Sequence, residues 1–355
     1  MIPYIIVFII LLLIKNNKKS NLYCFILIFL FMGSRYEVGK DWDIYYPIAE
    51  SIEFSKYSLF YNWFEKVTPL EYGWGDLYRY LTFEFSNRIL YKIVWLFKWP
   101  QLIIYLYSFF CLYFIKLGLE EIEQKYIKYS WILFFSFPEF FLLDTNLMRQ
   151  AVAVSIVFYS YKFIIKKEKF KFLAIIILAT TFHTSAIFCS ILYLVNYLKK
   201  LKKEIIILLY GILFFSKDIL FFLLKNSDII PQKYLGYLKL TFLGGIKTNY
   251  LIYFLGIIFI FFIVKKIERR KLILIILLGF YMNVMFKNTG YLVIRTRVYF
   301  LIFSLYLTPL LLSKYKISKI FFMLICFSIL VLSLINDITS LYGGQYVPYK
   351  IFINQ

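Results

Sequence analysis

Arg149 combines a strongly interacting side chain with an unusual position in the sequence. It lies in a polar stretch, residues 144–150, between apolar runs at 129–143 and 151–165. If those runs span a membrane, the charge sits near the hydrocarbon boundary and also opposes the positive end of the helix dipole. An anion offsets both penalties, because a helix N-terminus is itself suited to anion binding. We therefore expect Arg149 to meet an anionic group.

Arginine and lysine are distributed differently along the chain, which has eight arginines and 33 lysines. Arginine grips phosphate better than lysine, since its planar guanidinium donates paired hydrogen bonds and keeps its charge. Arg149, Arg295 and Arg297 open outward-pointing helices in the topology that we favour below, and we expect them to share an anionic site. Single arginines at the membrane interface are the simpler alternative. The arginines expected on or near the outer face are Arg35, Arg79, Arg88, Arg149, Arg295 and Arg297.

Three further residues are candidates for acid–base chemistry at such a site. Asp41, followed by Tyr45, lies in a stretch whose oxygens and aromatic rings suit sugar hydroxyls and sugar faces. Glu71 is followed by two glycines that flank a tryptophan, and His183 is the only histidine in the chain. A histidine in an apolar segment serves either as a general base near neutral pH or as a hydrogen-bonded packing residue. The sequence leaves open which of the three is the base, and a solvated polar loop is the alternative for each carboxylate.

The elements that position these residues are membrane helices. The chain has 355 residues, of which 62% are hydrophobic, and its mean hydropathy is +0.74. Its apolar runs recur at lengths of about 17 to 25 residues, which is the length needed to cross a bilayer. We expect an all-α, polytopic membrane protein with a single integral domain, residues 1–355. The four cysteines are irregularly spaced within apolar segments, so we expect no disulfide framework, no metal site and no other cofactor.

The net charge of +21 does not indicate nucleic-acid binding. Most of this charge is lysine in short loops between apolar runs, as the positive-inside rule predicts for cytoplasmic loops. The sequence also has no phosphate-binding glycine-rich loop, no zinc-protease histidine pair and no serine nucleophile elbow. The bilayer is therefore the partner that the charge indicates.

About eleven membrane segments are expected. Lysines follow the first segment rather than precede it, which predicts an uncleaved helix with its N-terminus outside. External loops are expected at 35–98 and 224–248, and residues 76–97 have the pattern of an amphipathic helix lying along the interface. The expected segments are 2–14, 21–34, 99–116, 128–143, 147–165, 172–198, 204–223, 249–265, 272–289, 296–313 and 319–336.

Loop charges favour a hairpin in the segment 172–198. The loops at 166–171 and 199–203 are both rich in lysine, so both are expected in the cytoplasm. The chain meets this condition if 172–198 forms two half-helices broken at Thr181–Ser185, and such breaks are tolerated where they line a cavity. A single continuous span is the alternative, and it would reverse every later loop.

Several motifs occur in a characteristic order. Arg35, Val38-Gly39-Lys40-Asp41 and Tyr45 come first. They are followed by Glu71-Tyr72-Gly73, by residues 146–153 around Arg149-Gln150, by 179–186 around His183, by Arg295 and Arg297 before Tyr299, and by Val347-Pro348-Tyr349. Each motif is loose on its own, but the ordered set covers most of the chain. In this order they resemble the EpsG-like branch of the Wzy-type polysaccharide polymerases.

The resemblance implies a glycosyltransferase that joins oligosaccharide repeat units, each linked to undecaprenyl pyrophosphate, into O-antigen, capsule or exopolysaccharide. It implies a site at the outer face of the bacterial inner membrane, metal-independent transfer with lipid pyrophosphate as leaving group, and a separate chain-length regulator as partner. A lipid-linked oligosaccharide flippase and a membrane O-acyltransferase are the alternatives. The resemblance implies catalysis by Asp41, Glu71, His183 and Arg149, and substrate binding by Arg35, Tyr45, Arg149, Gln150, Arg295, Arg297 and Tyr299.

Overall fold

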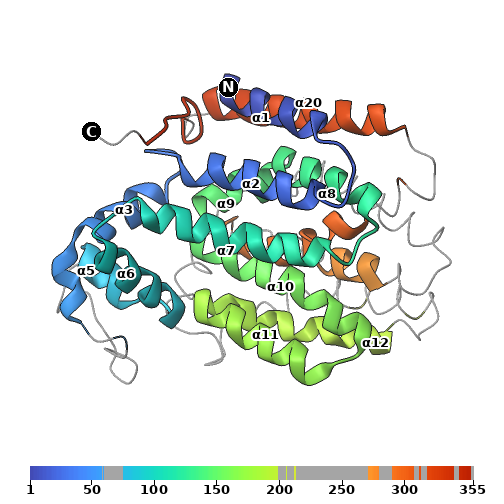
Figure 1. The fold of residues 1–355 in the computed structure, drawn as a ribbon. Coiled ribbons are helices and arrows are strands. Elements are labelled where there is room, and N and C mark those ends of the chain that lie inside the picture. The colour runs from blue at the N-terminus through green and yellow to red at the C-terminus, as the bar shows by residue number, and fades with distance from the viewer. Residues whose placement is uncertain are drawn as a thin grey trace. The chain divides into compact units, whose positions relative to one another are not determined.

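Helices form nearly all the regular structure that a computed structural model of the chain describes (Figure 1). The described part contains no β-strand, and Arg35 and Ile351 form only an isolated antiparallel bridge. The chain forms two compact units: unit 1 is Met1–Lys162, Leu173–Ile187 and Thr308–Gln355, and unit 2 is Phe163–Phe172 and Phe188–Leu307. The described residues are 1–57, 59, 75–198, 205, 212, 271–279, 290–307, 312, 318–339 and 344–352.

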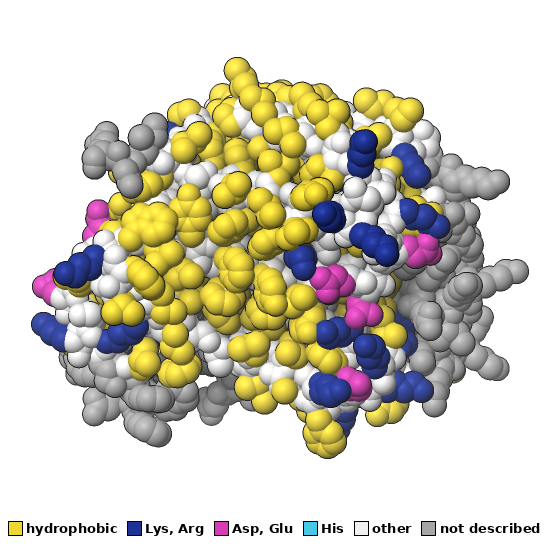
Figure 2. Space-filling model, viewed as in Figure 1, with side chains coloured by type: hydrophobic (Ala, Val, Ile, Leu, Met, Phe, Trp, Pro, Cys, Tyr) yellow, Lys and Arg dark blue, Asp and Glu magenta, His cyan; other side chains and the backbone are white. Residues whose placement is uncertain are grey.

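Long apolar helices form the body of unit 1. Leu and Ile side chains on their outer faces are strongly exposed, for example 54% at Leu30 and 58% at Leu324, as expected where lipid replaces water. In Figure 2 apolar side chains cover the middle of the visible face, and lysine and arginine gather where α7 ends. These helices are α1 (Ile2–Leu13), α2 (Ser20–Gly33), α7 (Leu102–Leu119), α8 (Gln124–Ser136), most of α10 (Met148–Lys166) and α20 (Lys319–Thr339).

Lysines gather at one end of these helices, here called the lysine end (Lys15, Lys18, Lys19, Lys116, Lys128 and Lys319). The Asn21 amide donates to the Lys116 carbonyl at 3.1 Å, and Trp131 donates to Asn21 at 2.8 Å, so one side chain joins α2, α7 and α8. The Lys128 ammonium donates to the last carbonyls around α1, at Leu12 and Ile14. These bonds use carbonyls that a helix end leaves unpaired.

The opposite end of unit 1 is here called the arginine end (Arg35, Asp41, Gln101 and Arg149). The buried Gln101 amide donates to the carbonyls of Gly33 at 2.8 Å and Arg35 at 2.9 Å, which fixes the end of α2 beside the start of α7. α2 and α7 therefore run in opposite directions between the two ends. All of the sequence motifs that fall in the described part of unit 1 lie toward the arginine end.

The expected count of eleven membrane segments is not confirmed. Among the described residues, two helices are long and apolar enough to cross a bilayer, Leu102–Leu119 and Lys319–Thr339. The apolar helices Ile2–Leu13, Ser20–Gly33 and Thr184–Tyr197 are shorter. The expected segments 249–265 and almost all of 204–223 lie outside the described residues, as does the expected external loop 224–248. The expected all-helical, apolar chain is confirmed in the described part.

The expected loop 35–98 is mostly helical where it is described. It contains α3 (Trp42–Glu50), the 3-10 helix η1 (Ile52–Lys56), α5 (Asp76–Leu81) and α6 (Phe85–Phe97). The prediction of one amphipathic helix over 76–97 was wrong, because α5 and α6 are separate helices with a break at 82–84. Arg88 stabilises the break by donating from Nη2 to the Leu81 carbonyl at 2.6 Å and from Nε to the Phe83 carbonyl at 2.9 Å.

The chain reverses direction at His183. α11 (Lys169–Phe182) precedes this residue, and the 3-10 helix η3 (Thr184–Leu194) and α12 (Val195–Leu198) follow it. In unit 2 the Tyr193 hydroxyl donates to the Lys167 carbonyl at 2.8 Å, and the Asn196 amide donates to the Ile164 carbonyl at 3.1 Å. The second half therefore returns to where the first began. This reversal has the shape of the predicted hairpin and not of a single straight span.

The rest of the described part of unit 2 is also helical. Residues 271–279 form one helix, and α18 (Gly290–Leu301) forms another. A Cβ atom added to Gly279 would lie 2.7 Å from the Cβ atom of Phe300, so the two helices pack too closely there for a larger residue.

Candidate functional site

Two motifs that lie far apart in the sequence meet at the start of α10. The Asp41 carboxylate accepts a hydrogen bond from the Met148 amide at 2.9 Å, and the Asn146 side chain accepts one from the Lys40 amide at 2.7 Å. Asp41 thus satisfies an amide that the helix start leaves unpaired, with its negative charge at the positive end of the helix dipole. The loop before α3 and the start of α10 therefore form one structure.

Gly39 makes this close approach possible. Its φ of +87° lies in the left-handed region that favours glycine, and a Cβ atom there would lie 2.7 Å from the Thr145 carbonyl oxygen. The Gly39 amide also donates to the Gln345 carbonyl at 2.7 Å. A larger residue at this position would separate the loop from α10.

Arg149 lies in the first turn of α10, and its side chain contacts three neighbouring side chains. Its Nη1 donates to Oε2 of Glu84 at 2.6 Å, and its Nε donates to the Tyr45 hydroxyl at 2.6 Å. Its Cζ lies 4.4 Å from the centroid of the Phe83 ring, within the range of a cation–π interaction. The Arg149 side chain is still 24% exposed, so part of the guanidinium remains accessible.

Glu84 is the functional candidate that the sequence reasoning missed. It lies at the break between α5 and α6, where its Oε1 accepts from the Thr184 amide at 3.2 Å and its Oε2 accepts from Asn87 at 3.2 Å. Burial raises the pKa of the Glu84 carboxyl, but Arg149, His183 and backbone amides outweigh burial and hold this pKa below its ordinary value. The carboxylate is therefore ionised at neutral pH. The only local signal was the polar group that surrounds it, Thr82, Ser86 and Asn87.

Asn87 connects Glu84 to the turn at His183. Its amide donates to the Phe182 carbonyl at 2.8 Å, and it accepts from the Tyr107 hydroxyl at 3.0 Å. His183 is buried at 7% exposure, and its Nδ1 lies 2.7 Å from the Ser185 hydroxyl. A histidine, a carboxylate and an arginine are thus gathered within one hydrogen-bonded region of unit 1.

Arg35 faces the interior of the arginine end. It is 1% exposed, and its Nη1 donates to the Met32 carbonyl at 2.7 Å and to the Ser108 hydroxyl at 3.4 Å. Within the described residues its Nε and Nη2 have no hydrogen-bond partner. Burial lowers the pKa of the Arg35 guanidinium to about 10, against the opposing effect of Tyr349, Tyr4 and Asp41, so the group stays charged at neutral pH.

The C-terminal segment closes the same end of unit 1. The Asn146 amide donates to Oε1 of Gln345 at 2.6 Å and also to the Tyr346 hydroxyl. The Tyr349 ring stacks on Phe31 with centroids 4.2 Å apart, and its hydroxyl donates to the Phe31 carbonyl. The motif around Val347-Pro348-Tyr349 is therefore held against both the Arg35 and the Asn146 motifs.

The remaining predicted site residues fall in three places. Tyr45 and Gln150 are buried, and they belong to unit 1 like Arg35, Asp41, Arg149 and His183. Arg295, Arg297 and Tyr299 lie on α18 of unit 2, where Arg297 and Tyr299 are buried and all three have partners. Glu71 lies outside the described residues. The structure therefore brings together the site residues of unit 1, and those on α18 belong to a separately described unit.

Metal ligands do not cluster in the part of the chain that the structure describes. It contains no group of three or more His, Cys, Asp or Glu side chains that could hold an ion. All four cysteines are free and buried. The described site therefore consists of a partly accessible guanidinium, an ionised carboxylate, a phenol and an imidazole.

A sequence model of the EpsG family matches residues 20–351, which is nearly the whole chain. The chain belongs to the EpsG family. EpsG is a family of Wzy-like polymerases, so membership suggests a polysaccharide polymerase, and with the apolar helices it indicates a membrane protein. No curated protein and no solved structure matches the chain. In this EpsG family member, the matched region contains the whole network around Arg149 and the C-terminal segment that closes it.

Proposed function

We propose that this EpsG family member is a polymerase that joins oligosaccharide repeat units carried on undecaprenyl pyrophosphate into a surface polysaccharide. The observation that carries the proposal is the Arg149 guanidinium in the first turn of α10, charged, preorganised by Glu84 and Tyr45, and still 24% exposed. Such a group suits the developing charge on a leaving pyrophosphate. O-antigen, capsule and exopolysaccharide are the products that this chemistry supplies.

The proposed reaction is glycosyl transfer from a lipid-linked donor. A hydroxyl oxygen of one repeat unit attacks the anomeric carbon of the growing chain, and a new C–O bond forms. The bond from that carbon to the pyrophosphate oxygen breaks, and lipid pyrophosphate leaves with the electron pair. The hydroxyl proton passes to a carboxylate or an imidazole. Pyrophosphate is already an activated leaving group, so the proposal includes no metal ion.

Glu84 joins the candidates for the general base. Asp41 accepts a hydrogen bond from the Met148 amide at the start of α10. His183 Nδ1 lies within hydrogen-bond distance of the Ser185 hydroxyl. In the proposed reaction the pyrophosphate competes with Glu84 for Arg149. Once the guanidinium turns to the pyrophosphate, the pKa of Glu84 rises because its largest stabilising charge has left, and the carboxylate becomes a better proton acceptor.

The proposed orientation places the arginine end outside the bacterial inner membrane. The lysine end then faces the cytoplasm, as the positive-inside rule requires. The donor pyrophosphate would reach Arg149 from the outer leaflet. Arg35, Tyr45, Gln150, Arg295, Arg297 and Tyr299 remain proposed binding residues, and Asp41, Glu71 and His183 remain proposed catalytic residues.

A single substitution tests the role of Arg149. Arg149→Lys keeps the charge but removes the paired donors, and one charge-assisted hydrogen bond is worth roughly 1.5–3 kcal/mol. We expect polymer synthesis in a complemented deletion strain to fall about ten- to a hundredfold at equal membrane level of the protein. Arg79→Lys is the matched control, because Arg79 forms only an exposed ion pair with Asp76. Full polymer length and yield with Arg149→Lys would refute the pyrophosphate role.

The deletion strain itself separates the classes of function. Surface glycan carrying a single repeat unit is expected for loss of a polymerase. Loss of all surface glycan with internal accumulation would indicate a flippase instead. Normal chain length without acyl groups would indicate an O-acyltransferase.

A further inference from the structure

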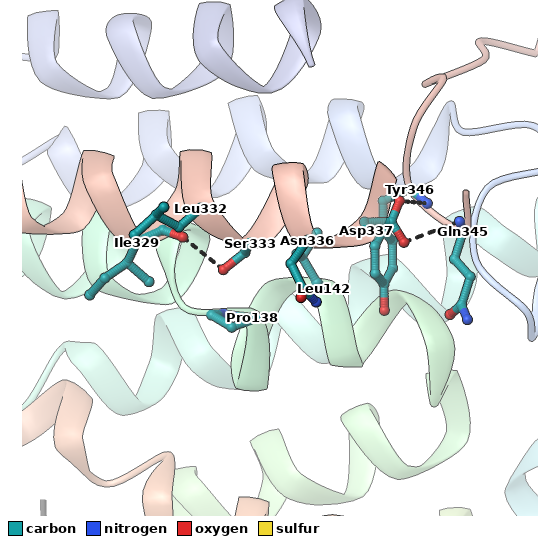
Figure 3. Close-up of a pocket in the computed structure, with 9 residues that line it drawn as sticks. All are labelled: Pro138, Leu142, Ile329, Leu332, Ser333, Asn336, Asp337, Gln345 and Tyr346. Atoms are coloured by element: carbon teal, nitrogen blue, oxygen red, sulfur yellow. Dashed lines mark hydrogen bonds between the residues drawn. The ribbon is translucent and has the colours of Figure 1, made fainter. Parts of the chain in front are cut away.

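A cavity lies in unit 1, beside α20, and none of its lining residues binds Arg149. It is open to the surface and has a volume of about 540 Å³, within the usual range of small-ligand sites. Figure 3 shows side chains converging on it from three elements: α20, the π-helix η2 (Pro138–Leu142) and the C-terminal segment. The lining residues are Pro138, Leu142, Ile329, Leu332, Ser333, Asn336, Asp337, Gln345 and Tyr346.

The lining divides into an apolar part and a polar, uncharged part. Pro138, Leu142, Ile329 and Leu332 offer hydrocarbon, whereas Ser333, Asn336, Gln345 and Tyr346 offer hydroxyl and amide groups. Lysine and arginine are absent from these nine residues, so the cavity has no described cation for a phosphate. Asp337 adds a negative charge, which disfavours an anionic ligand further. The lining therefore selects a neutral molecule with both apolar faces and hydroxyl groups.

Asp337 is engaged by the backbone of the C-terminal segment. Its carboxylate accepts from the amides of Gln345 at 3.2 Å, Tyr346 at 3.0 Å and Val347 at 3.2 Å, and Figure 3 shows the first two bonds. These bonds hold one wall of the cavity in place. Binding there consequently needs little ordering of the chain, which lowers the entropic cost.

Asn336 supplies the hydrogen-bonding capacity that a ligand would use. Its side chain is exposed in the last turn of α20 and has no hydrogen-bond partner among the described residues. An exposed amide can both donate to and accept from a ligand's hydroxyl groups. The neighbouring Ser333 hydroxyl donates to the Ile329 carbonyl at 2.7 Å, so its oxygen can still accept.

The cavity is linked to the start of α10 by its polar wall. Gln345 and Tyr346 both accept hydrogen bonds from Asn146, which precedes Arg149 by three residues. A molecule extending from the Arg149 region along this wall would pass from the cationic site to an uncharged one. That order matches a sugar chain whose pyrophosphate end is anionic and whose sugars are neutral.

We infer that this cavity is a saccharide subsite that binds neutral sugar residues of the glycan. Sugar C–H faces pack on Ile329, Leu332 and the Tyr346 ring, and sugar hydroxyls bond to Asn336 and Ser333. The inference rests on the proposed function, because that function supplies the glycan. It adds the location of a sugar-binding site that lies apart from the pyrophosphate-binding arginine.

A binding experiment on the purified full-length protein in detergent tests the inference. The probe is the repeat-unit oligosaccharide of the same strain, released from its lipid by mild acid so that it has no pyrophosphate. Leu332→Trp should fill the cavity and weaken binding at least tenfold, and Asn336→Leu should weaken it about fivefold. Leu324→Trp is the matched control, because Leu324 lies on the same helix at 58% exposure, against 64% for Leu332, and does not line the cavity. Its affinity should be unchanged.

Several outcomes would overturn the subsite. Unchanged affinity in Asn336→Leu and Leu332→Trp is one, and equal losses in Leu332→Trp and Leu324→Trp are another. Unaltered saccharide binding together with loss of undecaprenyl phosphate binding in the two cavity variants would indicate a lipid groove instead. If Leu332→Trp does not fold, as judged by thermal melting, Asn336→Leu decides alone.

The same assay separates this inference from the proposed function. Arg149→Lys should bind the released saccharide with the affinity of the unaltered protein, since the probe has no pyrophosphate. Polymer synthesis that survives Arg149→Lys would remove the proposed role of Arg149. It would leave the saccharide measurement unaffected.

Discussion

Oε2 of Glu84 lies 2.6 Å from Nη1 of Arg149, and this contact joins the break between α5 and α6 to the first turn of α10. The pair explains how a positive charge is tolerated at the start of an apolar helix. It also defines what an anionic substrate must do, because a pyrophosphate that binds Arg149 has to compete with an internal carboxylate. The ion pair therefore stabilises the charge of Arg149 in the folded protein and, in the proposed reaction, competes with the pyrophosphate.

Glu84→Gln separates the binding and base roles that we propose for this carboxylate. Without the charge, pyrophosphate no longer competes for Arg149, so the donor KM should stay equal or fall. The kcat should fall about a hundredfold if Glu84 is the general base, given the usual contribution of such a group. Polymerisation of lipid-linked repeat units by the purified protein measures both constants. Glu53→Gln, an exposed carboxylate of η1, is the control, and an unchanged kcat in Glu84→Gln would exclude the base role.

The ion pair also predicts how stability depends on pH. The pKa of Glu84 is lower in the folded protein than its ordinary value of 4.5, so ionised Glu84 stabilises the fold above about pH 4.5. This contribution is fully present at neutral pH and is lost as the pH falls from 4.5 through the folded-state value. Thermal melting of the protein and of Glu84→Gln should show a Tm difference that is constant from pH 7 to about 5.5 and shrinks below. A difference that grows on acidification would contradict the assignment.

The sequence predicted the chemistry around Arg149 better than it predicted the partner. A charge at a helix start requires an anion, and that argument depends only on local sequence. The anion itself is 65 residues away and lies at a helix break that Arg88 stabilises by bonding to Leu81 and Phe83. The mixed apolar and charged residues of 76–97 predicted one amphipathic helix, whereas Glu84 at the break makes contacts with Arg149 and Thr184, which lie far away in the sequence.

Local sequence predicted the reversal at His183 but not the burial of Arg35. The polar interruption at 181–185 predicted a reversal, since loop lysines required one, and the described contacts of Tyr193 and Asn196 have that geometry. Arg35 looked like a surface arginine at the end of a segment, but it is 1% exposed beneath the C-terminal segment. Arg35 pairs through its backbone with Ile351, more than 300 positions later, and no local pattern contains that contact.

Asp41 can be tested as a structural residue and as a base in one series. Its carboxylate accepts from the Met148 amide, and an asparagine can accept in the same way. Asp41→Asn should therefore keep stability and most polymer synthesis, whereas Asp41→Ala should lose roughly 0.5–2 kcal/mol of stability, as for other helix N-terminal caps. Denaturant unfolding in detergent measures the loss, with the exposed Asp43→Ala as control. Loss of activity in a stable Asp41→Asn protein would instead make Asp41 the base.

Gly39→Ala tests whether the approach of the Asp41 loop to α10 is required. The substitution forces a side chain into a φ of +87° and places its Cβ atom 2.7 Å from the Thr145 carbonyl oxygen, which is backbone and cannot turn away. A strained residue of this kind costs about 1–3 kcal/mol, so the Tm and the membrane level should both fall. Gly75→Ala is the matched control, since a Cβ atom there has no atom of the described residues within 4 Å. Equal stability of the two variants would show that the loop tolerates separation from α10. The assignment of Asp41 as the cap of α10 would then be wrong.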